Sequence, residues 1–298
     1  MMRILLFLGT NLAIILVASL TLNILGVGSY LTANGLDLNA LLAFCAVFGF
    51  AGAFVSLFLS KWMAKMSTKT QIIEQPSSAE ERWLVETVQE LANKAGIGMP
   101  DVGVFPSHAS NAFATGWNRN NALVAVSTGL LTRFKPEEIK AVLAHEIGHV
   151  ANGDMITLTL IQGVINTFVM FLARIVGYAV DSFLRRGDNN SGGVGIGFYI
   201  ATFVAEIIFG VLASIIVAWF SRRREFRADE AGASLASTAG MIGALQRLKA
   251  ESMAHQEGEL EGQLTAFGIS SIKKQGFMEL FSSHPPLDER IAALQARR

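Results

Sequence analysis

The segment His145-Glu146-Ile147-Gly148-His149 brings two imidazoles and a carboxylate close together on a predicted helix. Side chains four positions apart share a helix face, so His145 and His149 can bind one tetrahedral ion at about 2.0–2.1 Å each. Glu146 is turned by about 100° from His145. It can therefore stand beside the metal as the general base for water. The segment predicts a zinc site of a hydrolytic enzyme.

Two histidines leave a catalytic zinc site one protein ligand short, because such sites take three and keep the fourth position open. The one cysteine, Cys45, lies in an apolar run, so the third ligand is expected to be His, Asp or Glu. Glu225 and Asp229 share a predicted helix face, and Glu225 can ligate while Asp229 accepts a hydrogen bond from a ligand histidine. An exposed helix that pairs these acids with Arg222 and Arg223 explains the spacing equally well.

Composition indicates a membrane protein. Hydrophobic residues make up 51% of the chain and charged residues 16%, whereas soluble domains carry about 25% charged residues. The net charge of zero gives no sign of a nucleic-acid partner. Crossing a bilayer takes about 20 apolar helical residues, and four stretches qualify: Ile4–Val27, Leu38–Leu59, Met155–Val180 and Val194–Phe220. We interpret the first as a retained anchor rather than a signal peptide.

The third stretch contains the polar residues Gln162, Asn166 and Arg174. These side chains either line a water-filled cavity, or bond to neighbouring helices while Arg174 extends to the interface.

Basic residues beside membrane spans mark the cytoplasmic side. If the four spans alternate, the basic clusters fall on one side, which we expect to be cytoplasmic; Arg185 and Arg186 in the opposite loop go against this rule. The predicted parts are 1–60 (two spans), 61–154 (catalytic), 155–220 (a hairpin of two spans) and 221–298 (catalytic). The hairpin returns Glu225 to the membrane face that carries His149. The clusters are Lys61, Lys65 and Lys69, and Arg222, Arg223, Arg224 and Arg227.

The two cytoplasmic parts are expected to be α+β, mostly helical with a small antiparallel sheet. Residues 251–276 are polar and are expected to form a mobile connection. Strands are predicted at Val102–Phe105, Asn111–Trp117 and Ala122–Ser127, the last two as a hairpin. Helices are predicted from Ser78 to Gly96, from Pro136 to Val150, over Glu225–Ala236 and Ala239–Ala250, and near the end through Leu294.

Four motifs resemble the HtpX-type heat-shock metalloproteases, relatives of the integral-membrane prenyl-protein endopeptidases. They are SNAFATG at 110–116, HEIGHVANGD at 145–154, SRRREFRADEAGA at 221–233 and SHPPLDERI at 283–291. With the spans, the resemblance covers nearly the whole chain. It implies a zincin-like catalytic domain with one zinc ion per subunit, held by His145, His149 and Glu225, with Glu146 as base.

The resemblance also implies where and on what such an enzyme acts. It implies a multi-pass protein of the bacterial inner membrane with its site facing the cytoplasm. There it would cleave damaged or unfolded membrane proteins in stress-related quality control. A membrane chaperone or receptor with a non-catalytic zinc site is the alternative, although such a site gains nothing from Glu146. A zinc-responsive transporter is a further alternative, which would need polar residues in several spans.

Two further assignments concern substrate. The segment Asn111, Ala112 and Phe113 begins a predicted strand that could pair with an extended substrate by β-augmentation, or be an ordinary hairpin strand. His284 could hydrogen-bond the oxyanion of the tetrahedral intermediate, or cap the final helix.

Overall fold

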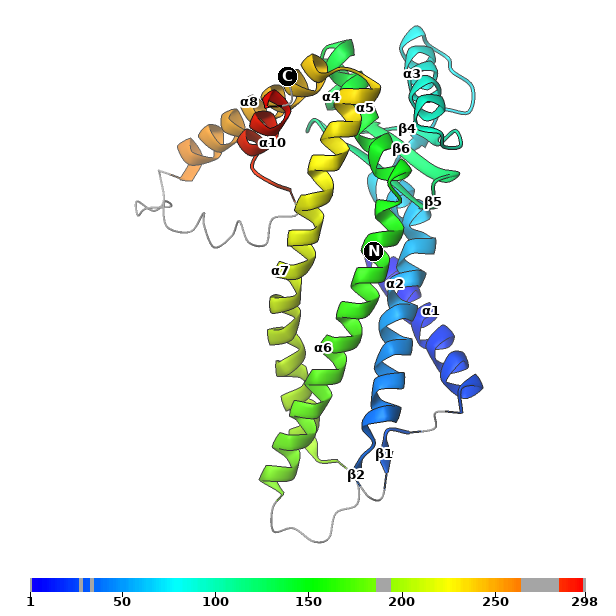
Figure 1. Ribbon diagram of the computed structural model, residues 1–298, viewed down its shortest axis with the longest axis vertical. Coiled ribbons are helices and arrows are strands. Elements are labelled where there is room, and N and C mark those ends of the chain that lie inside the picture. Colours follow the sequence, from blue (N-terminus) through cyan, green and yellow to red (C-terminus); the bar gives the residue numbers. More distant parts are fainter. Residues whose placement is uncertain (1, 27–28, 33–34, 186–193, 264–283, 297–298) are drawn as a thin grey trace. The chain divides into compact units, whose positions relative to one another are not determined.

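The structure is a computed structural model that describes residues 2–26, 29–32, 35–185, 194–263 and 284–296 (Figure 1). It divides into two compact units. Residues 1–58 and 157–217 form the first, here called the apolar unit; residues 59–156 and 218–298 form the second, the sheet unit.

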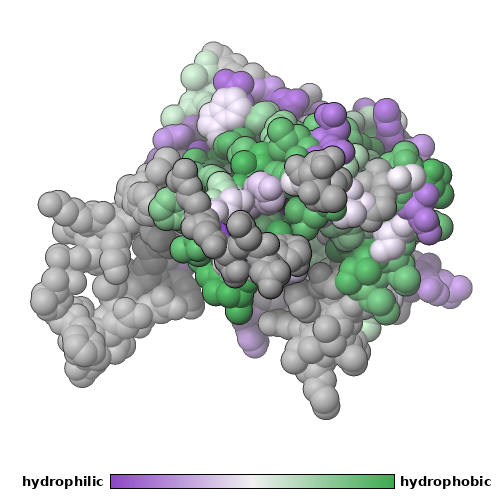
Figure 2. All heavy atoms as spheres, turned by 90° about the horizontal axis from the view of Figure 1, so that it is seen from below, coloured by the Kyte–Doolittle hydropathy of each residue, from purple (hydrophilic) through white to green (hydrophobic). Residues whose placement is uncertain are grey.

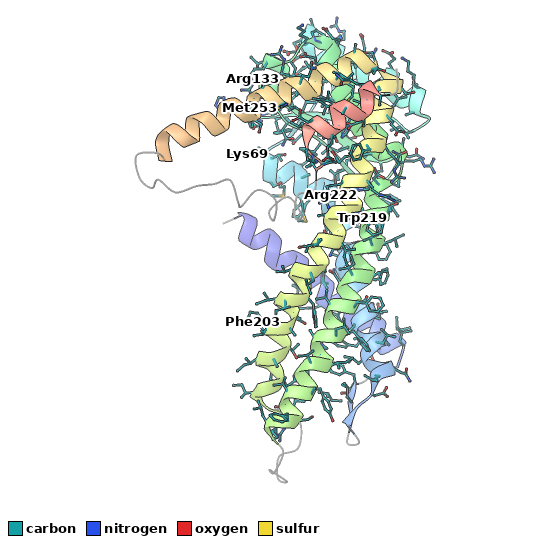
Figure 3. All side chains as sticks on the ribbon, turned by 60° about the vertical axis from the view of Figure 1, so that its left-hand side comes forward. Lys69, Arg133, Phe203, Trp219, Arg222 and Met253 are labelled. Carbon is teal, nitrogen blue, oxygen red and sulfur yellow. The ribbon has the colours of Figure 1, made fainter. Side chains whose placement is uncertain are left out.

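The apolar unit is built from helices, with a two-stranded ribbon of β1 (Leu31–Thr32) and β2 (Gly35–Leu36). Three helices that enter it are long and apolar enough to cross a membrane. Phe203 projects outward from α7 (Ile196–Leu235) and is 64% exposed (Figure 3). Figure 2 shows hydrophobic side chains gathered in continuous areas of one face. The three are α2 (Leu38–Thr68), α6 (Asp154–Leu184) and α7 (Ile196–Leu235).

The first predicted span coincides with helix α1 (Met2–Ile24). Among the described residues its apolar stretch is Ile14–Ile24, which is shorter than the three long helices. Three of the four predicted spans therefore coincide with helices that are long and apolar enough to cross a membrane, and the crossing by α1 stays a prediction.

The polar groups of α6 have partners both within the helix and on a neighbouring helix. Gln162 donates to Asn166 at 2.7 Å within the same helix. Arg174 forms an ion pair with Glu206 of α7 at 3.0 Å. The arginine thus finds its partner inside the helical hairpin, where a counter-charge lowers the cost of burial.

The sheet unit contains a four-stranded sheet of order β3-β4-β6-β5. The predicted hairpin is present, but the expectation of a wholly antiparallel sheet is wrong, because β4 pairs with β6 in parallel. The connection 106–111 leads from β4 to β5 and leaves one strand position open between them. Strand β6 then occupies that position. The strands are β3 (Gln71–Ile72), β4 (Asp101–Phe105), β5 (Ala112–Asn118) and β6 (Asn121–Ser127).

Five of the helices that the structure describes belong wholly to the sheet unit. Ser78 caps the first by accepting from the backbone N–H of Glu81, and Gly96 ends it at φ 67°, a left-handed conformation that suits glycine. Pro136 opens the helix that carries the two predicted histidine ligands. The five are α3 (Ala79–Ala95), α4 (Thr128–Arg133), α5 (Pro136–Ala151), α8 (Thr238–Gln263) and α10 (Leu287–Gln295).

Helix α5 lies in the middle of this unit and is buried along most of its length. Strand β6 is buried from its second residue onward, as expected for a central strand covered on both faces. Apolar side chains of α3, β6 and α5 make one core, whose close packing holds α5 in place. This core includes Leu84, Val88, Leu91, Val124, Val126, Leu143 and Ile147.

Two helices are longer than the sequence predicts. The fourth predicted span and the Glu225 helix form one continuous helix, α7, because the change from apolar to charged residues at Ser221 alters the surroundings and not the helix propensity. Helix α8 runs to Gln263, so the predicted mobile connection is wrong for residues 251–263. Glu, Gln and Met are good helix formers, so this stretch can continue the helix. Residues 264–276 lie outside the described residues.

Candidate active site

The site is built on two helix segments of the sheet unit, α5 and the end of α7. His145 and His149 stand one helical turn apart on α5, with ring centroids 4.8 Å apart and ring planes at 88°. The Nε2 atoms of both rings face Glu225 on α7, at 3.7 Å for His145 and 3.3 Å for His149. Three side chains that are far apart in sequence therefore aim their ligand atoms at one point.

This arrangement fits a metal ion. The ligand atoms of His145, His149 and Glu225 all lie within 4.8 Å of one another. Two ligands of a tetrahedral zinc ion, each about 2.1 Å from it, are about 3.4 Å apart, close to the observed 3.3 and 3.7 Å. Glu225 and Asp229 are 3% and 2% exposed. The alternative of an exposed helix that pairs its acids with arginines in solvent is therefore wrong.

The other ring nitrogens face carboxylates. His149 Nδ1 lies 2.7 Å from Asp154 Oδ2, and His145 Nδ1 lies 3.0 Å from Asp229 Oδ1, although the latter contact is not aligned as a hydrogen bond. Such carboxylates fix the tautomer and orientation of metal-binding imidazoles. Helical spacing predicted the role of Asp229 but not that of Asp154. The sequence feature that could have indicated Asp154 is its position as a lone carboxylate at the start of an apolar span.

His149 is strongly biased towards the protonated form in the absence of a metal. Its burial favours the neutral ring, but hydrogen bonds with Asp154 and Glu225 outweigh that effect and raise the pKa of His149 to about 9. Negative charge thus surrounds the place where the two Nε2 atoms converge, as a cation site requires.

Glycine allows the two helices to approach closely. A Cβ atom at Gly148 would lie 2.6 Å from the Cβ of Ala231 and 3.5 Å from the Cα of Ala228, both on α7. No side chain fits that space, so α7 can bring Glu225 within reach of the histidines only because position 148 is glycine.

The C-terminal motif supplies cationic partners to the acids of α7. Arg290 on α10 contacts Asp229 through two nitrogens at 2.8 and 2.6 Å, and lies 3.2 Å from Glu225 Oε2. Its side chain is 7% exposed, so this paired fork stabilises two buried carboxylates. The motif is visible in the sequence but the role of Arg290 is not, because its partners lie about 60 residues earlier.

His284 also reaches Glu225. Its Nδ1 lies 2.8 Å from Glu225 Oε2, while the ring is 65% exposed. The N-cap residue of helix α10 is Pro286, which makes no side-chain capping hydrogen bond, so His284 is not the N-cap residue.

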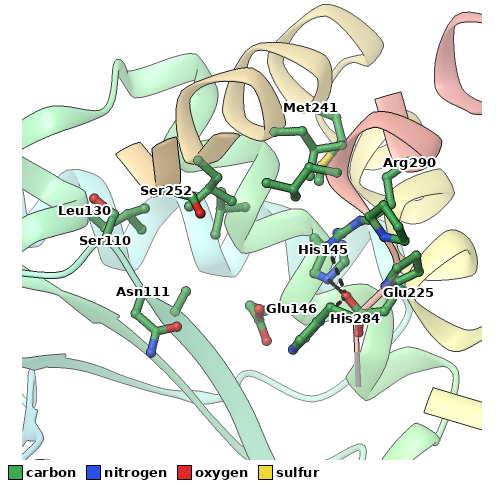
Figure 4. A pocket seen from close by; sticks show the side chains of 17 residues that line it. Ser110, Asn111, Leu130, His145, Glu146, Glu225, Met241, Ser252, His284 and Arg290 are labelled. Atoms are coloured by element: carbon green, nitrogen blue, oxygen red, sulfur yellow. Dashed lines mark hydrogen bonds and ion pairs between the residues drawn. The ribbon is translucent and has the colours of Figure 1, made fainter. Parts of the chain in front are cut away.

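A cavity of about 700 Å³ opens beside these groups (Figure 4). Glu146 lines it with His145, Glu225, His284 and Arg290, and so faces the same space as the ligand cluster without belonging to it. The opposite part of the lining is largely apolar and comes from β5, α4, α5 and α8. It includes Ala112, Leu130, Val142, Met241, Leu245 and Leu248.

The predicted substrate strand lies partly at this cavity. Asn111 and Ala112 line it, and β5 is an edge strand of the four-stranded sheet in the described part of the chain, the kind of strand to which a further strand can pair. The Phe113 side chain instead packs on Phe105, with ring centroids 5.4 Å apart, because successive residues of a strand face opposite sides. Any contact of Phe113 with substrate must therefore come from its backbone.

Comparison with known proteins agrees with this geometry. Residues 78–298 match peptidase family M48. The chain is 66% identical to Protease HtpX of Hahella chejuensis, with complete coverage of both chains, and 65% identical to Protease HtpX of Alcanivorax borkumensis, covering 100% of this chain and 99% of the other. A crystal structure of S. mikatae Ste24p has a similar fold, with a TM-score of 0.59 and 20% identity; the match covers 85% of this chain and 58% of that one.

The family and the full-length relatives confirm the resemblance noted in the motifs, and with it a peptide-bond hydrolase that depends on a metal. The long apolar helices α2, α6 and α7 agree with a protease of the membrane. This chain belongs to peptidase family M48.

Proposed function

We propose that the metal is zinc, one ion per subunit, held by His145, His149 and Glu225. The convergence of both Nε2 atoms on the Glu225 carboxylate carries this proposal. Two imidazole nitrogens and one carboxylate oxygen are a ligand set typical of catalytic zinc, with a fourth position left for water or substrate. When bound, zinc supplies Lewis-acid activation of water and polarisation of the scissile carbonyl.

Glu146 is the general base in this proposal. It lines the cavity beside His145 and stands outside the ligand cluster. Its carboxylate takes a proton from the attacking water and later delivers it to the leaving amine. No covalent acyl-enzyme forms, so the reaction needs no serine or cysteine nucleophile.

Three further residues hold the proposed metal ligands in position. Asp154 and Asp229 orient His149 and His145 through their Nδ1 atoms, and Arg290 holds Asp229 and Glu225 in place. His284, exposed and lining the same cavity, is positioned to donate a hydrogen bond to the oxyanion of the tetrahedral intermediate.

The substrate is an extended polypeptide, such as an unfolded or damaged membrane protein. Regular helices already pair their backbone groups, whereas an extended segment can add itself to edge strand β5. Asn111, just before this strand, and Ala112, its first residue, line the cavity with Glu146, which supports binding of such a segment there.

We place the site at the cytoplasmic face of a bacterial inner membrane, in proteolytic quality control under stress. The basic residues after the spans support this orientation, and the high-identity relatives are bacterial proteases. In this arrangement 1–60 and 155–220 supply membrane helices, while 61–154 and 221–298 supply the two catalytic parts.

Removal and restoration of metal on the purified full-length protein tests the proposal. Dialysis against a chelator should abolish cleavage of an unfolded protein such as casein, and stoichiometric zinc should restore it. Metal analysis should then find one zinc ion per chain. Cleavage that persists in protein shown to be metal-free would contradict the proposal, and so would a zinc-loaded protein that only binds casein.

A further inference from the structure

Three segments of the sheet unit expose large apolar side chains. Trp62 on α2 is 51% exposed, Trp117 at the end of β5 is 41% exposed, and Met99 in the connection before β4 is 37% exposed. None of them lines the cavity beside Glu146. Exposed large apolar side chains, here two tryptophans and a methionine, are typical of a surface that contacts a membrane or a partner when they lie together.

Polar contacts tie the three segments together. Lys61, next to Trp62, forms an ion pair with Asp101 at 2.9 Å and donates to Asn121 Oδ1 at 2.8 Å. In the same way the backbone N–H of Gly98, next to Met99, donates to Asn120 Oδ1 at 3.0 Å. The end of α2, the connection before β4 and the β5–β6 turn therefore lie next to one another within the sheet unit.

The sequence of α2 predicts where this helix leaves the bilayer. Lys61 is the first charged residue after Asp37, and the helix is continuous from Leu38 to Thr68. At about 1.5 Å per residue the uncharged stretch 38–60 is about 34 Å long, which matches the hydrocarbon core of about 30 Å. We therefore expect α2 to leave the bilayer at Lys61, which donates a hydrogen bond to Asn121.

The β5–β6 turn has features of an interfacial element. Gly116 has φ 146°, and the pairing register shifts between Gly116 and Asn118. The resulting bulge contains Trp117, which fits the role of bulges in turning a side chain away from the regular strand direction. Exposed Arg119 follows. Tryptophan and basic residues together are the usual composition at the level of lipid headgroups.

We propose that Trp62, Met99, Trp117 and Arg119 form a surface that contacts the lipid interface of the membrane crossed by α2. The occupant is the bilayer itself because the same helix that enters the membrane carries Lys61 and Trp62 at its exit. Arg119 meets anionic headgroups, while the tryptophans and Met99 enter the boundary with the acyl chains.

This surface sets a distance for proteolysis, an inference that rests on the proposed function. Strand β5 has Ala112 at the cavity and Asn118 at the turn. At about 3.3 Å per residue these ends are about 20 Å apart. An extended substrate that leaves the membrane beside the turn and pairs along β5 reaches Glu146 only about six residues from its last membrane-embedded residue.

Lipid-side quenching tests the surface without using proteolysis. In a Cys45→Ser background, full-length protein with Trp117→Cys is labelled with a fluorophore and placed in vesicles of phosphatidylethanolamine and phosphatidylglycerol, with or without a nitroxide near the lipid glycerol. Glu86→Cys, at an exposed position on α3, is the matched control, and zinc content verifies folding of both. The label at position 117 should lose at least half its emission while that at position 86 is unchanged. Equal quenching at the two positions overturns the proposal.

A series of substrates tests the distance. Each substrate carries one membrane helix followed by an unstructured Gly/Ser tail with a cleavable sequence 2, 4, 6, 8 or 12 residues from the helix, and mass spectrometry locates the cuts. Cleavage should begin at about six residues and stay efficient beyond. Efficient cuts at two residues overturn the distance while leaving the metal chemistry intact. A zinc-loaded enzyme that cuts none of the tails contradicts the proposed function instead, and the quenching result still decides the surface.

Discussion

Asp154 Oδ2 lies 2.7 Å from Nδ1 of His149, at the junction where α5 ends and α6 begins. The carboxylate is 1% exposed, and Arg224 donates to its backbone carbonyl at 3.3 Å. A proposed metal ligand is therefore oriented by the first residue of a helix that continues into the apolar unit.

Asp154→Asn should weaken zinc affinity by about 10- to 100-fold, because the amide cannot stabilise the ligating tautomer of His149 as a carboxylate does. Competition with a chromophoric chelator measures the change. Asp288→Asn is the matched control, since Asp288 is exposed and pairs with Lys249; it should keep wild-type affinity. Equal affinity in the two variants would show that Asp154 does not support the metal.

Glu146→Gln should retain zinc and lose activity by about 10²- to 10⁴-fold, the scale of general-base catalysis. The amide preserves the shape of the side chain but cannot take a proton from water. Metal content and casein cleavage are measured on the same preparation, with Glu86→Gln as the control for an exposed carboxylate. Wild-type turnover in Glu146→Gln would falsify the assigned role.

The sequence could predict the local part of the site. His145, Glu146 and His149 lie within one helical turn, and Glu225 and Asp229 are separated by one turn on the second helix. Helical periodicity is a property of neighbouring residues, so it places ligand atoms on one face without any tertiary information.

The long-range part could not be predicted in this way. Arg290 meets Asp229 only after α10 has docked, and the parallel pairing of β4 with β6 depends on the order in which strands enter the sheet. Neither leaves a periodic signal in the sequence. Phe113 shows a further limit, because the choice of which strand face meets the cavity depends on register.

Glu225→Ala should abolish stoichiometric zinc binding, whereas Glu230→Ala should retain it. Both residues lie on α7, but only Glu225 joins the cluster with the two histidines. Equilibrium dialysis followed by metal analysis measures the difference. Loss of zinc in Glu230→Ala, with retention in Glu225→Ala, would mean that the helix register of the third ligand is wrong.

Gly148→Ala should destabilise the sheet unit by about 1–3 kcal/mol, the usual effect of adding a methyl group to a packed interior. The added Cβ would lie 2.6 Å from the Cβ of Ala231, and separation of α5 from α7 should also weaken zinc binding. Gly210→Ala is the matched control, because a Cβ there meets no atom within 4 Å. The thermal unfolding midpoint in detergent and the zinc affinity are compared. The explanation fails if both variants behave alike.

The last prediction concerns which side of the membrane carries the site. The cluster from Lys61 to Lys69 favours a cytoplasmic position for the chain after α2, and a helix that crosses the membrane then places the chain before it outside. In a Cys45→Ser background, Gln75→Cys should be protected from a membrane-impermeant maleimide in intact cells and labelled after permeabilisation. Ser29→Cys, at an exposed position before α2, should be labelled in intact cells. The reverse pattern would place the catalytic residues outside, and would require the substrate to approach from that side.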